Sequence, residues 1–133
     1  MRRMFVDTSA WFAYVNRSDP DHAAVAPVLR AHEGRLVTSS YVFDELVTLL
    51  RYRADHATAV RVGAWILDAA TVDLVQVTAE DERRAWALFT GRPDQSYSFT
   101  DCTSFALMRR LGIDEAVALD DDFVREGFRT HPG

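Results

Sequence analysis

Four acidic residues stand at places where a carboxylate serves folding poorly, and together they suggest a shared chemistry. They fall at the expected ends of strands and in the first turns of helices: Asp7, Glu45, Asp101 and Asp120. In an open parallel sheet, the carboxyl ends of the strands line the crevice where ligands bind. Four like charges gathered there would be costly for a domain that is stable by only ~5–15 kcal/mol. A hard divalent cation, Mg²⁺ or Mn²⁺, is the expected compensation, because these ions prefer oxygen ligands and accept substrate phosphate.

Each acid also has a simpler structural explanation when it is taken alone. Asp7 could cap a helix that begins at Ser9, and Asp101 could close a capping box with Ser98. The three successive aspartates at 120–122 could form a solvated turn. Against the last reading, Phe123 should pack back on the sheet and fix the loop, which would aim at least one aspartate at the strand ends.

Glu45 is the most informative acid in the sequence. A helical projection places it inside an apolar arc, whereas its neighbour Asp44 falls on the polar side. Burying an unpaired carboxylate costs several kcal/mol, so an inward Glu45 needs compensation. A metal ion would provide it, and so would a partly buried ion pair with Arg51 or Arg53.

The expected elements alternate between short β-branched runs and longer stretches of helical period, which is typical of α/β proteins. Strands are expected at residues 4–6, 35–38, 74–77 and 116–119, with a short edge strand at 128–130. Helices are expected at residues 9–16, from 22 to near 34, from 40 onward, and at 57–70, 79–90 and 99–111. The sequence predicts a single α/β domain over residues 1–133, with a central parallel β-sheet flanked by α-helices on both faces.

Composition excludes several classes of protein. The chain has 133 residues and a net charge of -5, and all 15 of its basic residues are arginine. Without lysine there is no Walker-type phosphate loop, no Schiff-base chemistry and no phosphoryl-accepting receiver site. A single cysteine, Cys102, excludes an internal disulfide and a multi-cysteine zinc site. Apolar stretches are far shorter than the ~20 residues of a membrane span, so we expect a cytoplasmic protein with no membrane contact.

Four segments in order carry a resemblance to a known family. They are Phe-Val-Asp-Thr-Ser-Ala from residue 5, Thr-Ser-Ser-Tyr-Val-Phe-Asp-Glu-Leu from residue 38, Ser-Phe-Thr-Asp-Cys from residue 98 and Ala-Leu-Asp-Asp-Asp-Phe from residue 118. With these motifs the chain resembles the PIN-domain family, and within it the ribonuclease toxins of VapBC-type toxin–antitoxin systems. The resemblance covers essentially the whole chain. It implies a PIN-domain-like fold, an Mg²⁺ or Mn²⁺ cofactor and endonucleolytic cleavage of RNA.

The resemblance also implies roles for individual residues and partners. Asp7, Glu45, Asp101 and Asp120 would be the catalytic and metal-binding quartet, with Asp122 able to share or replace the role of Asp120. Thr8 and Ser9 would assist near the metal or phosphate. Hydrolysis by a metal-activated water would leave 5′-phosphate and 3′-hydroxyl ends. The implied partners are an RNA substrate, a cognate antitoxin and a second copy in a homodimer. The alternative is a catalytically inactive PIN-like module that acts through protein or RNA contacts.

Two further groups of residues leave their roles open at this point. The arginine pairs at 83–84 and 109–110 could guide RNA, but solvated helix ends explain them equally well. Three tryptophans, Trp11, Trp65 and Trp86, stand in three expected helices at positions that favour the core. A base-stacking role for one of them is the alternative.

Overall fold

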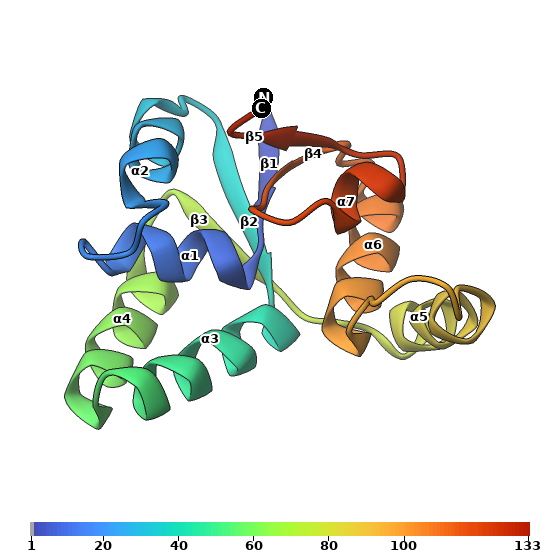
Figure 1. The fold of residues 1–133 in the computed structure, drawn as a ribbon, viewed down its shortest axis with the longest axis horizontal. Helices are drawn as coiled ribbons and strands as arrows, with labels where there is room; N and C mark the ends of the chain where they lie inside the picture. Colours follow the sequence, from blue (N-terminus) through green and yellow to red (C-terminus); the bar gives the residue numbers. More distant parts are fainter. Residues whose placement is uncertain (1) are drawn as a thin grey trace.

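A five-stranded, all-parallel sheet forms the centre of the computed structural model, which describes residues 2–133 (Figure 1). The strand order is β3-β2-β1-β4-β5. The strands are β1 (Arg3–Val6), β2 (Arg35–Ser39), β3 (Val72–Val75), β4 (Glu115–Val117) and β5 (Arg129–His131). The central strands are buried on both faces, as continuous apolar runs in a parallel sheet require.

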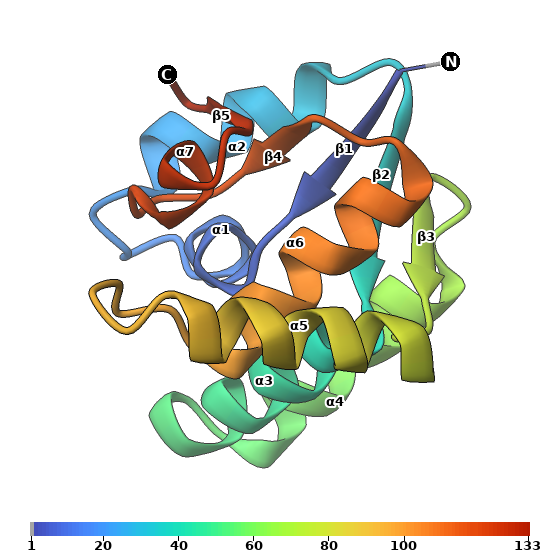
Figure 2. The same ribbon diagram turned by 90° about the vertical axis from the view of Figure 1, so that its right-hand side faces the viewer.

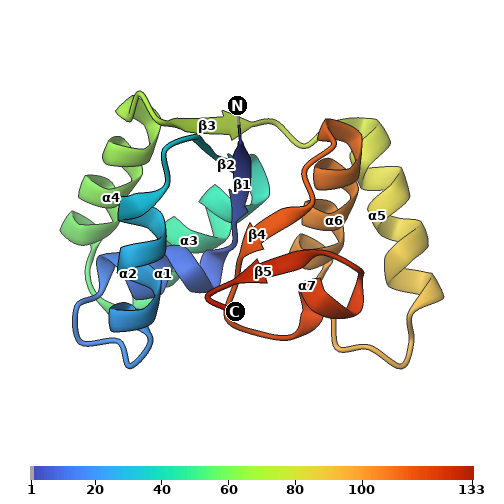
Figure 3. The same cartoon turned by 90° about the horizontal axis from the view of Figure 1, so that it is seen from above.

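Seven helices cover the two faces of the sheet. They are α1 (Thr8–Val15), α2 (His22–Ala31), α3 (Ser40–Arg53), α4 (His56–Asp68), α5 (Ala79–Gly91), α6 (Phe99–Leu111) and α7 (Asp122–Arg125). Seen from above, α1 to α4 lie on one side of the strands and α5 to α7 on the other (Figure 3). This division follows from right-handed crossovers, because the chain moves from β1 toward β3 in the first half and across to β4 and β5 in the second. The predicted α/β class, with helices on both faces, is confirmed.

The topology creates one switch point, between β1 and β4. The connection that leaves β1 runs toward β2, and the connection that leaves β4 runs toward β5 in the opposite direction. Ligands of open α/β sheets bind where connections diverge in this way, outside the carboxyl ends of the strands. Asp7 follows β1 directly, and Asp120 lies three residues beyond β4.

The core fixes the loop that follows β4. Phe123 is fully buried and its ring lies 4.9 Å from that of Phe105 and 6.2 Å from that of Phe5, between centroids. The expected return of Phe123 to the sheet is therefore confirmed. Phe123 belongs to the short helix α7, which spans residues 122–125 and ends the acidic loop. The sequence pattern did not predict this helix.

Two other sequence expectations are wrong in detail. Strand β3 ends two residues before the expected end, because the N–H of Val77 donates to the hydroxyl of Ser40 instead of to a neighbouring strand. Of the three tryptophans only Trp11 is buried, whereas Trp65 and Trp86 are 44% and 60% exposed. Figure 2 shows the reason for Trp86, since α5 lies outermost over α6 and has a free outer side. Within residues 2–133 there is no helix with the length and apolar character needed to cross a membrane.

Candidate active site

The carboxylates of Asp7, Asp101 and Asp120 are brought to the switch point from three separate parts of the chain. The N–H of Asp7 donates to the carbonyl of Val117 at 3.0 Å, so Asp7 continues the pairing of β1 with β4. Asp101 stands in the first turn of α6, and Asp120 stands in the loop after β4. Asp7 is only 4% exposed. A strand end, a helix start and a loop thus converge on one acidic site.

Burial and neighbouring carboxylates raise the pKa of all three acids. Burial raises the pKa of Asp7 to about 7, and the charges of Asp101 and Asp120 add to the effect. Burial also raises the pKa of Asp101 to about 6, with further contributions from Asp120 and Asp122. The pKa of Asp120 is raised by partial desolvation and by the acids that follow it. Within residues 2–133, every ion pair uses other acids, although the charge of Arg125 lowers the pKa of Asp120 without forming an ion pair with it.

Ser9 ties Asp7 to the loop that carries Asp120. Its hydroxyl donates to Oδ2 of Asp7 at 3.0 Å and accepts the N–H of Leu119 at 3.4 Å. The Asp7 side chain makes no capping bond to α1, so the simpler structural explanation of this residue is wrong. Asp7 is a buried carboxylate positioned by the hydroxyl group of Ser9.

Asp101 and Asp120 are also held by local hydrogen bonds. Oδ2 of Asp101 accepts the N–H of Ser98 at 3.0 Å, and the Ser98 hydroxyl accepts the N–H of Asp101, so the expected capping box is present. Oδ1 of Asp120 accepts the N–H of Asp122 at 3.0 Å. In both carboxylates one oxygen is engaged by the chain's own backbone and the other is available to a ligand.

Asp122 and Thr8 occupy different positions around this centre. Asp122 is buried, and it forms an ion pair with Arg125 at 3.3 Å. An ion pair therefore partly neutralises Asp122, whereas Arg125 forms no ion pair with Asp120 and only lowers its pKa through its charge. Thr8 is 5% exposed, and its hydroxyl oxygen is buried without any hydrogen-bond partner in residues 2–133. An unsatisfied buried hydroxyl is unusual in a folded protein and directs attention to a ligand that the chain itself does not supply.

The predicted burial of Glu45 is wrong. In α3 the residues Val42, Leu46 and Leu50 enter the core at every fourth position, and both Glu45 and Asp44 are exposed. The helical projection gave the correct order of residues around the helix. However, the stripe that contains Glu45 lies beside the core stripe instead of within it.

Glu45 nevertheless lies on the side of α3 that faces the start of α6. Together with Asp44 it lines an open pocket that Thr100, the residue immediately before Asp101 in α6, also lines. The ion pair that Glu45 was expected to form with Arg51 or Arg53 is absent from the described part of the chain. The structure therefore brings three of the predicted acids together and leaves the fourth, unpaired, at the rim.

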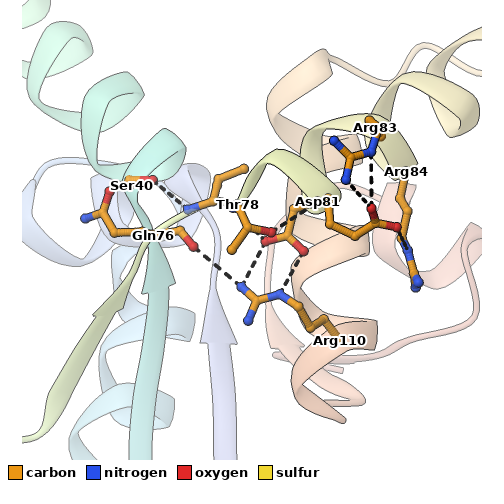
Figure 4. Close-up of polar contacts among 9 residues, drawn as sticks. Ser40, Gln76, Thr78, Asp81, Arg83, Arg84 and Arg110 are labelled. Carbon is orange, nitrogen blue, oxygen red and sulfur yellow. Dashed lines mark hydrogen bonds and ion pairs between the residues drawn. The ribbon is translucent and has the colours of Figure 1, made fainter.

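The arginine pairs singled out in the sequence have partners within the protein. Arg83 and Arg84 both bind Glu80, and Arg109 binds Glu126. These three arginines, together with Arg110, lie in the α5–α6 half of the molecule. Arg110 reaches Asp81 with two hydrogen bonds of 2.8 and 2.9 Å (Figure 4). The explanation by helix-end ion pairs therefore accounts for them better than contact with RNA.

The donor set fits a hard cation in its chemistry. Asp7, Asp101 and Asp120 supply carboxylate oxygens that no ion pair engages within residues 2–133 and whose pKa is raised, and Thr8 adds an unsatisfied hydroxyl nearby in sequence. In residues 2–133 no three His, Cys, Asp or Glu side chains are already arranged so that they could hold a metal ion. A bound cation would have to draw the carboxylates closer than they lie here.

Residues 4–128 match the family pattern of the PIN domain. The chain belongs to the PIN-domain family. It is 39% identical over 125 residues to the 23S rRNA-specific endonuclease VapC20 of Mycobacterium tuberculosis (strain ATCC 25618 / H37Rv), and the alignment covers 94% of this chain and 95% of that protein. Ribonuclease VapC26 of the same strain is 30% identical, over 88% of this chain and 86% of its own length. The resemblance to VapC-type PIN proteins found in the sequence is confirmed.

Solved PIN-domain structures have the same architecture. The crystal structure of Mycobacterium tuberculosis VapC20, described as a Sarcin-Ricin loop cleaving toxin, has a TM-score of 0.89 to this chain at 39% identity, covering 94% of this chain and 95% of that one. VapBC2 from Rickettsia felis, crystallised with a DNA fragment, has a TM-score of 0.72 at 13% identity over 97% of both chains. The second likeness shows a common fold alone. The PIN fold predicted from the four motifs is thus confirmed.

Proposed function

We propose that this PIN domain, residues 1–133, is a metal-dependent endoribonuclease toxin that hydrolyses RNA phosphodiester bonds. The observation that carries the proposal is the group of three carboxylates at the switch point, where burial and neighbouring acids raise the pKa of each and no ion pair within residues 2–133 engages them. Perturbed carboxylates in a strand-end crevice are typical of catalytic sites. The identity to a ribosomal RNA endonuclease over nearly the whole chain supports the same conclusion.

Asp7, Asp101 and Asp120, together with Glu45, are the residues that would hold Mg²⁺ or Mn²⁺. The ion, when bound, would lower the pKa of a water molecule and stabilise charge on the leaving oxygen. Ser9 orients the carboxylate of Asp7 through its 3.0 Å hydrogen bond. The Ser98 capping box fixes Asp101 at the start of α6. The proposed role of Glu45, whose side chain is exposed, is to take a proton from the attacking water.

The proposed partners follow from exposed surfaces and from the relatives. RNA is the substrate class, and 23S rRNA, which VapC20 is named for cleaving, is the first candidate. The stacked rings of Trp86 and Phe89 on the outer side of α5 support a homodimer interface. The apolar groove between α3 and α4, bordered by exposed Tyr52 and Leu67, supports docking of a cognate antitoxin. The cytoplasm, where the substrate is found, is the proposed place of action.

The deciding experiment is cleavage of RNA by the purified chain. Ribosomal RNA is incubated with the protein in Mg²⁺, in Mn²⁺ and in excess EDTA, and the 5′ ends of the products are sequenced. We expect cleavage with either metal, none in EDTA, and 5′-phosphate ends from attack by water. Asp7→Asn serves as the inactive control. Full cleavage in EDTA would exclude the metal, and no cleavage of any RNA by folded protein would favour the alternative, an inactive module that acts through contacts.

A further inference from the structure

The arginines of this chain differ sharply in how they are compensated. Most are paired with a carboxylate inside the protein, among them all those in α5, α6 and α7. Within residues 2–133 the exceptions are Arg3, Arg17, Arg30, Arg51, Arg53 and Arg61. Apart from Arg3, they all fall between residues 17 and 61, in the half that carries α1 to α4. Positive charge available to an outside ligand is therefore concentrated in that half.

Among these arginines, Arg53 lines a pocket that reaches the first turn of α6. Arg53 is the last residue of α3, and together with Asp44, Glu45 and Thr100 it lines an open pocket of about 420 Å³. Pockets of this size accommodate small polar ligands. Thr100 precedes Asp101 in α6, so the pocket borders the helical turn that carries one of the three carboxylates.

Arg53 is held in place without being neutralised. Its guanidinium lies over the ring of Phe12, with 5.8 Å from Cζ to the ring centroid. Phe12 belongs to α1 and packs against the core, so it offers a fixed surface for the planar group. Arg53 forms no ion pair with a described residue, unlike the arginines that stabilise the scaffold. A guanidinium that is positioned but has no anion is suited to a phosphate from outside, which it can contact at two points.

We propose that Arg53 binds a backbone phosphate of the RNA strand next to the scissile bond, and that Phe12 positions it. This inference rests on the proposed ribonuclease function and adds a binding element to it. The acidic centre repels RNA in the absence of metal, so a nearby uncompensated arginine gives the strand a point of attachment beside the reacting phosphate. Arg53 is thus a substrate-positioning residue that acts on affinity more than on the chemical step.

The test compares Arg53→Met with Arg30→Met, a closely matched control. Arg30 also lies over an aromatic ring, Tyr14, at 5.7 Å and also lacks an ion pair with a described residue, but it stands in α2 just before the start of β2, toward the amino ends of the strands and away from their carboxyl ends. We expect Arg53→Met to raise the KM for RNA roughly 10-fold while kcat stays within about three-fold, because a charge-assisted phosphate contact is lost. Arg53→Lys should recover part of the affinity, since it keeps the charge and loses the planar fork. Arg30→Met should match the wild type.

A binding measurement makes this inference independent of cleavage. A labelled single-stranded oligoribonucleotide of about 12 nucleotides is titrated in EDTA over a range of salt concentrations. Loss of one phosphate contact should reduce the slope of log K against log salt by about 0.7 in Arg53→Met and leave it unchanged in Arg30→Met. Phe12→Leu, checked for folding by circular dichroism, should weaken binding without changing the slope. If Arg53→Met keeps the wild-type slope and KM, or changes kcat alone, the inference is wrong. Failure of the wild type to cleave RNA would instead refute the proposed function.

Discussion

Two groups of buried acids in this protein have opposite electrostatic environments. At the junction of β3 and α5, Asp81 is fully buried, and burial alone would raise its pKa (Figure 4). The hydrogen bonds from Arg110 and Thr78 outweigh that effect and hold the pKa below its usual value. Arg109 and Arg92 likewise hold the pKa of Glu126 below its usual value, against the effect of burial. At the switch point, Asp7 is similarly buried and has no such partner, and its pKa is raised to about 7.

The contrast separates acids that serve the scaffold from acids that serve chemistry. The chain has enough arginines to neutralise its buried carboxylates, and it does so wherever the carboxylate joins two elements. A buried charge without a partner costs stability, so its persistence at Asp7, Asp101 and Asp120 needs another explanation. The explanation that we propose is a cation from outside, bound together with the substrate.

Asp7→Asn gives the largest expected effect. The amide keeps the hydrogen bond from Ser9 but removes the charge, so RNA cleavage should fall on the order of 100-fold or more. The metal-free variant should melt above the wild type, because repulsion with Asp101 and Asp120 is relieved. Initial cleavage rates in Mn²⁺ and thermal melts in EDTA test both parts. If Asp7→Asn cleaved RNA as fast as the wild type, the distinction between unpaired catalytic acids and arginine-paired structural acids would be wrong.

A comparison of Glu45→Gln with Asp44→Asn tests whether Glu45 takes part in catalysis together with Asp7, Asp101 and Asp120. Both residues are exposed, so neither substitution should affect folding by more than ~0.5 kcal/mol. We expect Glu45→Gln to lose at least about 10-fold in cleavage, since it removes the proton acceptor at the rim. Asp44→Asn should stay within about three-fold. If Asp44→Asn is the inactive variant, the assignment of the fourth acid is wrong.

Asp81→Asn examines the other side of the comparison. Removing this charge leaves Arg110 without its partner and weakens the capping box of α5, so the free energy of unfolding should fall by about 2 kcal/mol. Cleavage per folded molecule should not change. Chemical denaturation of this variant beside Asp7→Asn provides the readout. A loss of activity in fully folded Asp81→Asn protein would show that the β3–α5 junction is coupled to the site.

The dependence of stability on pH should differ between the two groups. Asp7 and Asp101 have pKa values raised from 3.8 to about 7 and about 6, so their stabilisation is full below about pH 4 and is lost as pH rises through 6 and 7. Glu115 is a further buried acid with partners inside the protein, because it pairs with Arg2 and His131. These partners lower its pKa from 4.5 to about 2, so it loses its stabilisation only as pH falls below 4.5. In EDTA, the Tm advantage of Asp7→Asn over wild type should grow by about 4 °C or more between about pH 5 and about pH 8. An equal advantage at both pH values would contradict the raised pKa.

Much of this architecture follows from local signals in the sequence. The alternation of apolar strands and periodic helices predicts the sheet and both helical layers. The capping-box pattern of Ser98 and Asp101 predicts the start of α6. Local signals cannot predict which of two neighbouring residues on a helix becomes buried, because packing against other elements decides it. The helical period places Glu45 next to the apolar stripe, but the exact boundary of the buried face depends on where α6 and the sheet meet α3.

Long-range pairing was similarly beyond the sequence pattern. Nothing near Asp81 indicates that Arg110, 29 residues away, will neutralise it, nor that Glu126 will bind arginines from two segments. The orphaned hydroxyl of Thr8 can be recognised only once burial is known. Likewise, the lack of an ion pair at Arg53 can be recognised only once the ion pairs of the other arginines are known.

Cys102, fully buried immediately after Asp101, provides a way to observe motion at the site. Burial raises the pKa of its thiol to about 11, so it reacts slowly with thiol reagents while α6 stays folded. It is the single cysteine of the chain, and labelling therefore reports one event, the local opening of the first turns of α6. The labelling rate therefore measures how often the first turns of α6, which carry Asp101, unfold locally. Any ligand that binds the carboxylates while α6 is folded would slow labelling, whether or not the ligand can be cleaved.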